Sequence, residues 1–201
     1  MECPLADVAS ADAKVERPLA GLDGGAKWTA PAVVNDNVDA SGVPTDQFQP
    51  SIAAGPNGAV AVVFYDRRRA CPNDRSILPS DAGRTNFCID TSLQAYKDSG
   101  SGAVPVAANV RISKYAWDPE QPGQHLGGLS QYPCAGATDP CARGDGFIGD
   151  YFALAISEGN IYALMVSTHY PSTVAADEGG PIYYQQQVLA TVPRSGFGTG
   201  Y

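Results

Sequence analysis

The stretch that decides the fold is residues 51–65, which read SIAAGPNGAVAVVFY. Its centre, residues 55–58, is a turn sequence, because glycine and asparagine supply the positive φ angles that tight turns need. Residues 59–65 then form an unbroken apolar run, which is typical of a strand buried on both faces. The sequence therefore predicts a β-hairpin with a fully buried second strand.

The same design returns further along the chain. Residues 152–166 read FALAISEGNIYALMV, and a shift of 101 positions aligns Gly58 with Gly159 and Val60 with Ile161 without a gap. Internal repeats of this kind indicate an architecture in which each unit buries its faces against its neighbours.

Each hairpin is followed by a polar loop and then by further strand patterns. After the first hairpin come residues 90–96 and 109–113, and after the second come residues 182–188. No stretch shows sustained helical spacing with caps. We predict an all-β fold built from β-propeller blades of four antiparallel strands.

The composition indicates a turn-rich, folded protein and disfavours some classes of binding partner. Glycine (22) and proline (16) together make about 19% of the chain, against about 12% in average usage, which indicates many turns. The apolar fraction of 44% supports a folded core. A net charge of −8 disfavours nucleic acid and anionic membranes as partners. The longest apolar run, residues 59–65, is far shorter than the ~20 residues of a membrane span.

The five cysteines bear on whether the protein resides in an oxidising or a reducing compartment. None stands in Cys-x-x-Cys spacing and neither histidine has ligand spacing around it, so a zinc site is disfavoured. Two local disulfides in an oxidising compartment are our preferred interpretation, and five reduced thiols are the alternative. The predicted pairs are Cys71–Cys88 and Cys134–Cys141, with Cys3 left over.

Residues 23–28 carry a motif with Asp-x-Gly-x-x-Trp spacing, made by Asp23, Gly25 and Trp28. Here the chain resembles the sialidase-like (BNR repeat) β-propeller family, whose Asp-box reads Ser-x-Asp-x-Gly-x-x-Trp. Only the first position differs, where Gly21 replaces Ser or Thr. The box is structural: its Asp accepts backbone N–H bonds, its Gly takes an unusual dihedral and its Trp packs between blades.

The resemblance covers most of the chain, since residues 46–53, 64–68 and 147–151 look like the ends of family hairpins. It implies a partial six-bladed propeller, the C-terminal fragment of a longer secreted precursor with its N-terminal blades missing; pairing with copies of itself is the alternative. The single partial domain, 1–201, divides into the end of a blade with its Asp-box (5–34), a full blade (46–113), a long interblade loop (114–146) and most of a further blade (147–201).

The resemblance also implies a chemistry, the exo-α-sialidase hydrolysis of terminal acidic sugars. Such an enzyme grips the substrate carboxylate with three arginines and uses a Tyr nucleophile, a Glu and an Asp acid. The family's Phe-Arg-Ile-Pro motif is absent, so catalysis stays uncertain. The catalytic candidates are Asp66, Arg67, Arg68, Asp150 and Tyr151, and the substrate-binding candidates are Arg111, Arg143, Trp117, His169 and Tyr183.

Each candidate also has a structural interpretation. Asp66 and Arg67 can form an ion pair between blades, and Asp150-Tyr151 can cap a strand. Trp117 can stack on a sugar or pack in the core, and His169 can be an exposed loop residue. No cofactor is expected, although Asp139, Asp145 and Asp150 are oxygen ligands suited to Ca²⁺.

The sequence therefore predicts an extracellular propeller that acts on or binds a glycan or glycoprotein. A non-catalytic extracellular module that binds glycan or protein is the competing hypothesis, and a propeller hydrolase of other acidic sugars is a third.

Overall fold

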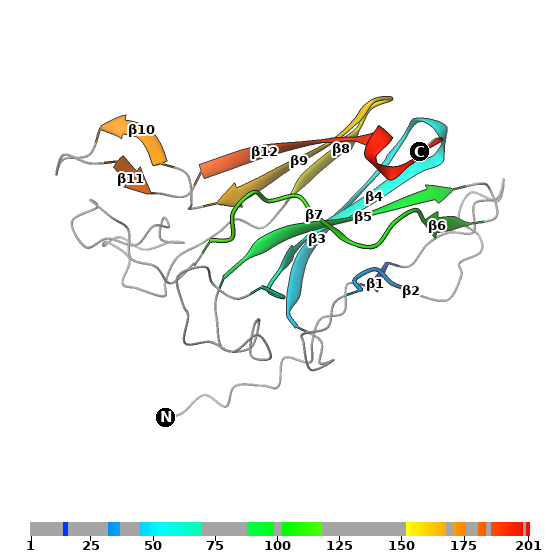
Figure 1. Cartoon of the computed structure of the whole chain (residues 1–201), viewed down its shortest axis with the longest axis horizontal. Coiled ribbons are helices and arrows are strands. Elements are labelled where there is room, and N and C mark those ends of the chain that lie inside the picture. Colours follow the sequence, from blue (N-terminus) through cyan, green and yellow to red (C-terminus); the bar gives the residue numbers. More distant parts are fainter. Residues whose placement is uncertain are drawn as a thin grey trace.

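The structure is a computed structural model whose description covers part of the chain. The described residues are 14–15, 32–36, 45–69, 88–98, 102–117, 152–167, 171–175, 181–183, 186–198 and 200–201. They fold almost entirely into antiparallel strands, which confirms the all-β prediction (Figure 1). The Asp-box residues Asp23, Gly25 and Trp28 lie outside the described residues.

The first sheet holds five strands. β3 (Gln47–Gly55), β4 (Ala59–Asp66) and β5 (Asp90–Asp98) form an antiparallel meander. β6 (Ala103–Pro105) and β7 (Val110–Arg111) both pair with the far edge of β5. β4 is buried along nearly its whole length, as its apolar run predicts.

The second sheet holds three strands in the order β12-β9-β8. They are β8 (Ala153–Ile156), β9 (Asn160–Ser167) and β12 (Gln186–Pro193), so the second predicted hairpin also forms. Outside the two sheets lie the strand pairs β1 (Lys14–Val15) with β2 (Ala32–Val33) and β10 (Pro171–Ala175) with β11 (Pro181–Tyr183), and the 3-10 turns η1 (Pro56–Gly58) and η3 (Arg194–Phe197). Within the described ranges, no helix has the length and apolar character needed to cross a membrane.

The two sheets pack against each other through their first strands, β3 and β8 (Figure 1). The core between them joins Ala61 of β4 and Leu93 of β5 to Ile161 of β9, all with no exposed surface. Gly55 makes the approach possible, since a Cβ at this position would lie 2.5 Å from the Cβ of Ile156. A second cluster, with Val34 over Val62 and Phe64, covers part of the opposite face of the first sheet.

The structure confirms the repeat in the second strand of each hairpin and shows a difference in the first strand. β4 and β9 are both eight residues long and start 101 residues apart, as the sequence shift predicts. The first strands slip by one residue, however. Gly55 pairs with Ala59 across three residues, whereas Ile156 pairs with Ile161 across a turn one residue longer. A slip of one residue reverses the face that a strand presents, so Leu154 of β8 corresponds to Ile52 of β3.

Arg194 fastens the two sheets together at their turns. Its Nη1 donates to the Ser157 carbonyl at 2.8 Å and its Nη2 to the Pro56 carbonyl at 3.2 Å. These two carbonyls stand at equivalent places in the repeat. The side chain is 2% exposed and lies over the Tyr201 ring, 5.3 Å from its centroid. Backbone carbonyls thus solvate a buried cation, which otherwise would cost several kcal/mol or more.

Candidate functional site

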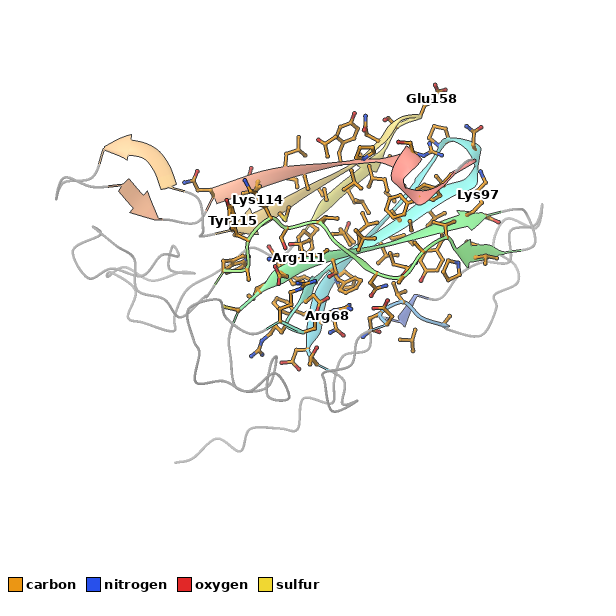
Figure 2. All side chains as sticks on the ribbon, in the orientation of Figure 1. Arg68, Lys97, Arg111, Lys114, Tyr115 and Glu158 are labelled. Carbon is orange, nitrogen blue, oxygen red and sulfur yellow. The ribbon has the colours of Figure 1, made fainter. Side chains whose placement is uncertain are left out.

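Polar side chains gather at one end of the first sheet. β4 ends at Asp66 and β5 begins at Asp90, and the strand register places these two residues opposite each other. Gln47, at the start of β3, pairs with Asp66 on its other side. Lys97 lies at the opposite end of the sheet, away from Arg68 and Arg111 (Figure 2). We call this polar end of the sheet the aspartate end.

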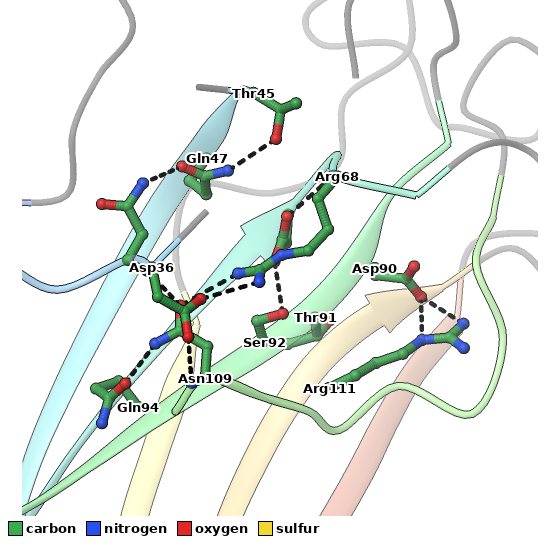
Figure 3. A network of polar contacts seen from close by, with 12 residues as sticks. Asp36, Thr45, Gln47, Arg68, Asp90, Thr91, Ser92, Gln94, Asn109 and Arg111 are labelled. Carbon is green, nitrogen blue, oxygen red and sulfur yellow. Dashed lines mark hydrogen bonds and ion pairs between the residues drawn. The ribbon is translucent and has the colours of Figure 1, made fainter. Parts of the chain in front are cut away.

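Asp66 is the centre of the network at the aspartate end, where Figure 3 labels its partners Arg68 and Ser92. Its side chain is fully buried and accepts hydrogen bonds from Arg68 Nε at 2.6 Å, from the Arg68 backbone N–H at 3.0 Å and from Ser92 Oγ at 2.6 Å. A buried carboxylate held in this way is satisfied by the chain itself.

Arg68 carries the network from the sheet to the neighbouring segments. Besides Asp66, its guanidinium binds Asp36 Oδ1 through Nη1 at 2.9 Å and Asn109 Oδ1 through Nη2 at 3.1 Å. Its Nε, Nη1 and Nη2 therefore each have an acceptor, and the three acceptors belong to different parts of the chain. This use of the guanidinium joins segments of the protein.

Asn109 and Asp36 bind each other through backbone and side chain. The Asn109 N–H donates to Asp36 Oδ2 at 2.8 Å, and the Asp36 N–H donates to Asn109 Oδ1 at 3.1 Å. Asn109 Nδ2 donates to the Val34 carbonyl and to Gln94 Oε1. Residues 34–36 are thereby fixed against the loop before β7.

A second aspartate–arginine ion pair, Asp90 with Arg111, lies beside the pair of Asp66 with Arg68. Asp90 Oδ1 accepts from Arg111 Nε at 2.7 Å, Arg111 Nη2 at 2.5 Å and Ser113 Oγ at 2.8 Å. Arg67 forms a third pair, 2.6 Å from Asp46 Oδ2, where the Asp46 side chain is 53% exposed. Arg67, Arg68 and Arg111 thus each contact an aspartate of the same chain.

An aromatic cluster lies next to this end, between the two sheets. Tyr65 contacts Phe48, Trp117 and Phe152, with ring centroids 5.2, 5.9 and 4.2 Å away, and its hydroxyl accepts the Val166 N–H at 3.0 Å. Burial raises the pKa of Tyr65 to about 12, against a smaller lowering by the Val166 hydrogen bond. Trp117 is 3% exposed, so it packs in this core.

The structure therefore brings together five of the sequence candidates: Asp66, Arg67, Arg68, Arg111 and Trp117. Tyr183 lies in β11, outside both sheets. Outside the described residues lie Asp150, Tyr151, Arg143 and His169. Asp139 and Asp145 also lie outside them, so the calcium hypothesis stays a prediction. In the described ranges, no group of three or more His, Cys, Asp or Glu side chains is placed to hold a metal.

Sequence reasoning missed the polar partners Asp36, Asp90, Ser92, Gln94 and Asn109. The sequence does contain one signal of these partners. Residues 90–94 belong to a predicted strand but are mostly polar, whereas the preceding predicted strand, 59–65, is apolar. Such residues need hydrogen-bond partners when the strand is buried.

Cys88 is buried and disulfide-bonded. Its predicted partner, Cys71, lies outside the described residues, as do Cys134 and Cys141, so both pairings stay predictions.

No protein-family model, curated protein or solved structure matches the chain. The resemblance to sialidase-like propellers therefore stays a prediction from the motifs alone.

Proposed function

We propose that this chain is part of an extracellular, sialidase-like β-propeller that binds a glycan or glycoprotein without hydrolysing it. The Asp-box and the hairpin motifs supply the ligand class by resemblance. The binding function, in preference to exo-α-sialidase activity, is supported by one observation: Arg67, Arg68 and Arg111 each contact an aspartate of the chain.

This observation bears on catalysis because a sialidase needs its guanidinium groups for the substrate carboxylate. Arg68 and Arg111 direct Nε and Nη atoms at Asp66, Asp36 and Asp90. Turning either side chain toward a ligand would leave a buried carboxylate without its cation, at a cost of about 3–5 kcal/mol.

Two further features support a propeller. Each sheet is an antiparallel meander, and the sheets stack with their first strands, β3 and β8, in contact. The long connections between β4 and β5 and between β9 and β12 occupy the same position in the two units. In a propeller such connections lie on one face, where ligands bind.

The test combines a turnover assay with a binding assay. The chain is incubated with a fluorogenic sialoside and, separately, applied to an array of sialylated and neutral glycans. We expect no release of fluorophore above the rate without protein, and retention on a subset of the glycans. Glu158→Ala, an exposed change at the far end of the sheets, serves as the control variant.

Turnover that disappears in Arg111→Ala and persists in Glu158→Ala would replace this proposal with the sialidase alternative. Absence of both turnover and glycan retention would reject a glycan ligand and leave the protein-binding module.

A further inference from the structure

The outer edge of the second sheet carries backbone groups that have no partner among the described residues. β12 is the border strand of this sheet (Figure 1). The Arg194 N–H donates to the Gly159 carbonyl at 3.0 Å, which continues the β9–β12 register by one residue. Because bonded positions alternate along an antiparallel strand, the N–H and C=O groups of the exposed residues Gln187, Leu189 and Thr191 point away from β9.

The first sheet shows what an edge of this kind binds. β5 and β12 are the third strands of their sheets and pair with β4 and β9 in registers that differ by the 101 residues of the repeat. The outward groups of β5 are paired: the Thr91 carbonyl accepts the Ile112 N–H at 2.8 Å, and the Ala95 carbonyl accepts the Val106 N–H at 3.0 Å. An extended segment therefore covers this edge in the first sheet.

The described residues that follow β12 do not cover its edge in the same way. They turn toward the first sheet, where the Gly200 carbonyl accepts a hydrogen bond from Lys97 Nζ at 2.5 Å. The Tyr201 hydroxyl donates to the Val60 carbonyl at 2.9 Å. Because residues 194–198 and 200–201 lead away from the edge, the outward groups of β12 need a strand from elsewhere.

The sequence of β12 permits pairing with a second copy of itself. Residues 186–193 read QQVLATVP and carry no charge, although charged side chains are the usual protection of an edge strand. Pro193, which cannot donate a hydrogen bond, stands only at the end of the strand. The chain has a net charge of −8, so an uncharged strand is a place where two copies meet without opposing like charges.

We propose that two copies of this chain pair through β12, antiparallel, about a two-fold axis at Leu189. Leu189 then lies opposite Leu189 of the second copy, and Gln187 lies opposite Thr191. Every outward N–H and C=O group of these three residues gains a partner, and the Leu189 side chain, which is 59% exposed in one copy, packs against its equivalent. The contact is isologous, so it closes as a dimer with one continuous sheet. It is independent of any glycan ligand.

The first test removes an outward backbone donor. Thr191→Pro deletes an N–H that the proposed partner needs and leaves the β9–β12 hydrogen bonds in place. Thr191→Ala is its matched control, because it keeps the N–H. Mass is measured by light scattering after size exclusion over a range of concentrations, and circular dichroism checks folding.

The second test depends on the register and on no proline. Leu189→Lys and Leu189→Glu each place like charges opposite each other across the two-fold axis, whereas an equimolar mixture places Lys opposite Glu. Val104→Lys is the control, because Val104 is 61% exposed and lies on β6 of the first sheet.

We expect the unmodified chain, Thr191→Ala and Val104→Lys to reach about twice the 20.9 kDa monomer mass at high concentration. Thr191→Pro, Leu189→Lys and Leu189→Glu should each stay at the monomer mass, and the mixture of the two Leu189 variants should recover the dimer. An unmodified chain that stays monomeric would overturn the proposal, and would mean that another segment of the chain covers the edge. A mixture that stays monomeric would overturn the register.

Amide hydrogen exchange locates the contact. We expect the amides of Gln187, Leu189 and Thr191 to exchange more slowly at high protein concentration than at low concentration, because the dimer occupies them. A dimer whose formation leaves the exchange of these amides unchanged would place the contact elsewhere and overturn the proposal.

Discussion

At the scale of single residues, Asp66 and Asp46 show two uses of the same side chain. Both carboxylates bind an arginine at 2.6 Å, but the Asp66 side chain is fully buried and that of Asp46 is 53% exposed. Water screens and solvates the exposed pair, so its contribution to stability is small. The buried carboxylate has no such substitute. Removing its charge takes a counter-ion from Arg68 and replaces one acceptor oxygen by an NH2 group, which faces the donors of Arg68 or Ser92.

We therefore predict that Asp66→Asn lowers the free energy of unfolding by about 2–4 kcal/mol. Asp46→Asn should lower it by less than about 1 kcal/mol. Urea unfolding of both variants under the same conditions measures the difference. Equal losses would contradict the assignment of Asp66 as the centre of the network.

The candidate site was predictable only in part at this scale. The run 66–68 at the end of an apolar strand indicates charged groups at a sheet end, and the ion-pair interpretation of Asp66 and Arg67 was one of two alternatives. Their partners are Arg68 for Asp66 and Asp46 for Arg67. Asp36 and Asn109 were not predictable, because they lie 73 residues apart in loops and meet only through the packing of the sheet.

At the scale of the element, the turn η1 shows that two glycines aligned in the sequence repeat can have different surroundings in the structure. Gly58 and Gly159 align in the repeat, but Gly58 has φ +70° and a Cβ there would lie 2.2 Å from the Asp98 carbonyl oxygen. Nothing lies within 4 Å of the Cβ position at Gly159. The hairpins themselves were predictable from their apolar runs. Their different turn lengths were not, because register depends on which face each strand buries.

The turn difference gives a prediction with an internal control. Gly58→Ala should lower the free energy of unfolding by more than about 1–2 kcal/mol, since the left-handed conformation alone costs that much for alanine and the clash adds to it. Gly159→Ala should change it by less than about 1 kcal/mol. Thermal unfolding followed by circular dichroism compares the two. A larger loss of unfolding free energy in Gly159→Ala than in Gly58→Ala would contradict the assignment of Gly58 as the strained glycine.

At the scale of the whole molecule, two tyrosines connect the sheets. The Tyr65 hydroxyl accepts the Val166 N–H, and the Tyr201 hydroxyl donates to the Val60 carbonyl at 2.9 Å. Burial raises the pKa of both to about 12; in Tyr201 the positive charge of Arg194 opposes part of this rise. The sequence predicted two stacked units but gave no sign of these links, which depend on contacts between distant strands.

These pKa values predict an alkaline loss of stability. In the unfolded chain the tyrosines lose their protons near pH 10.0, whereas in the folded chain they keep them up to about pH 12. The stabilisation is therefore complete below pH 10 and declines as the pH rises from 10 to about 12, by about 2 kcal/mol for Tyr65. Urea unfolding at stepped pH measures the decline. Tyr65→Phe should make it shallower, and an unchanged slope in this variant would contradict the assignment.

The bonds of Arg194 also set an order of events during protein synthesis. Pro56 and Arg194 are 138 residues apart, so the guanidinium cannot reach the Pro56 carbonyl until almost the whole described chain has left the ribosome. The first hairpin is complete long before, so its face with Ala59 and Ala61, which is buried in the core between the sheets of the folded protein, is exposed to other nascent chains. Contacts of such sequence separation form slowly, and exposed sheet surfaces aggregate in the meantime. Yield in a cell should therefore depend on translation rate and on chaperones that shield this face.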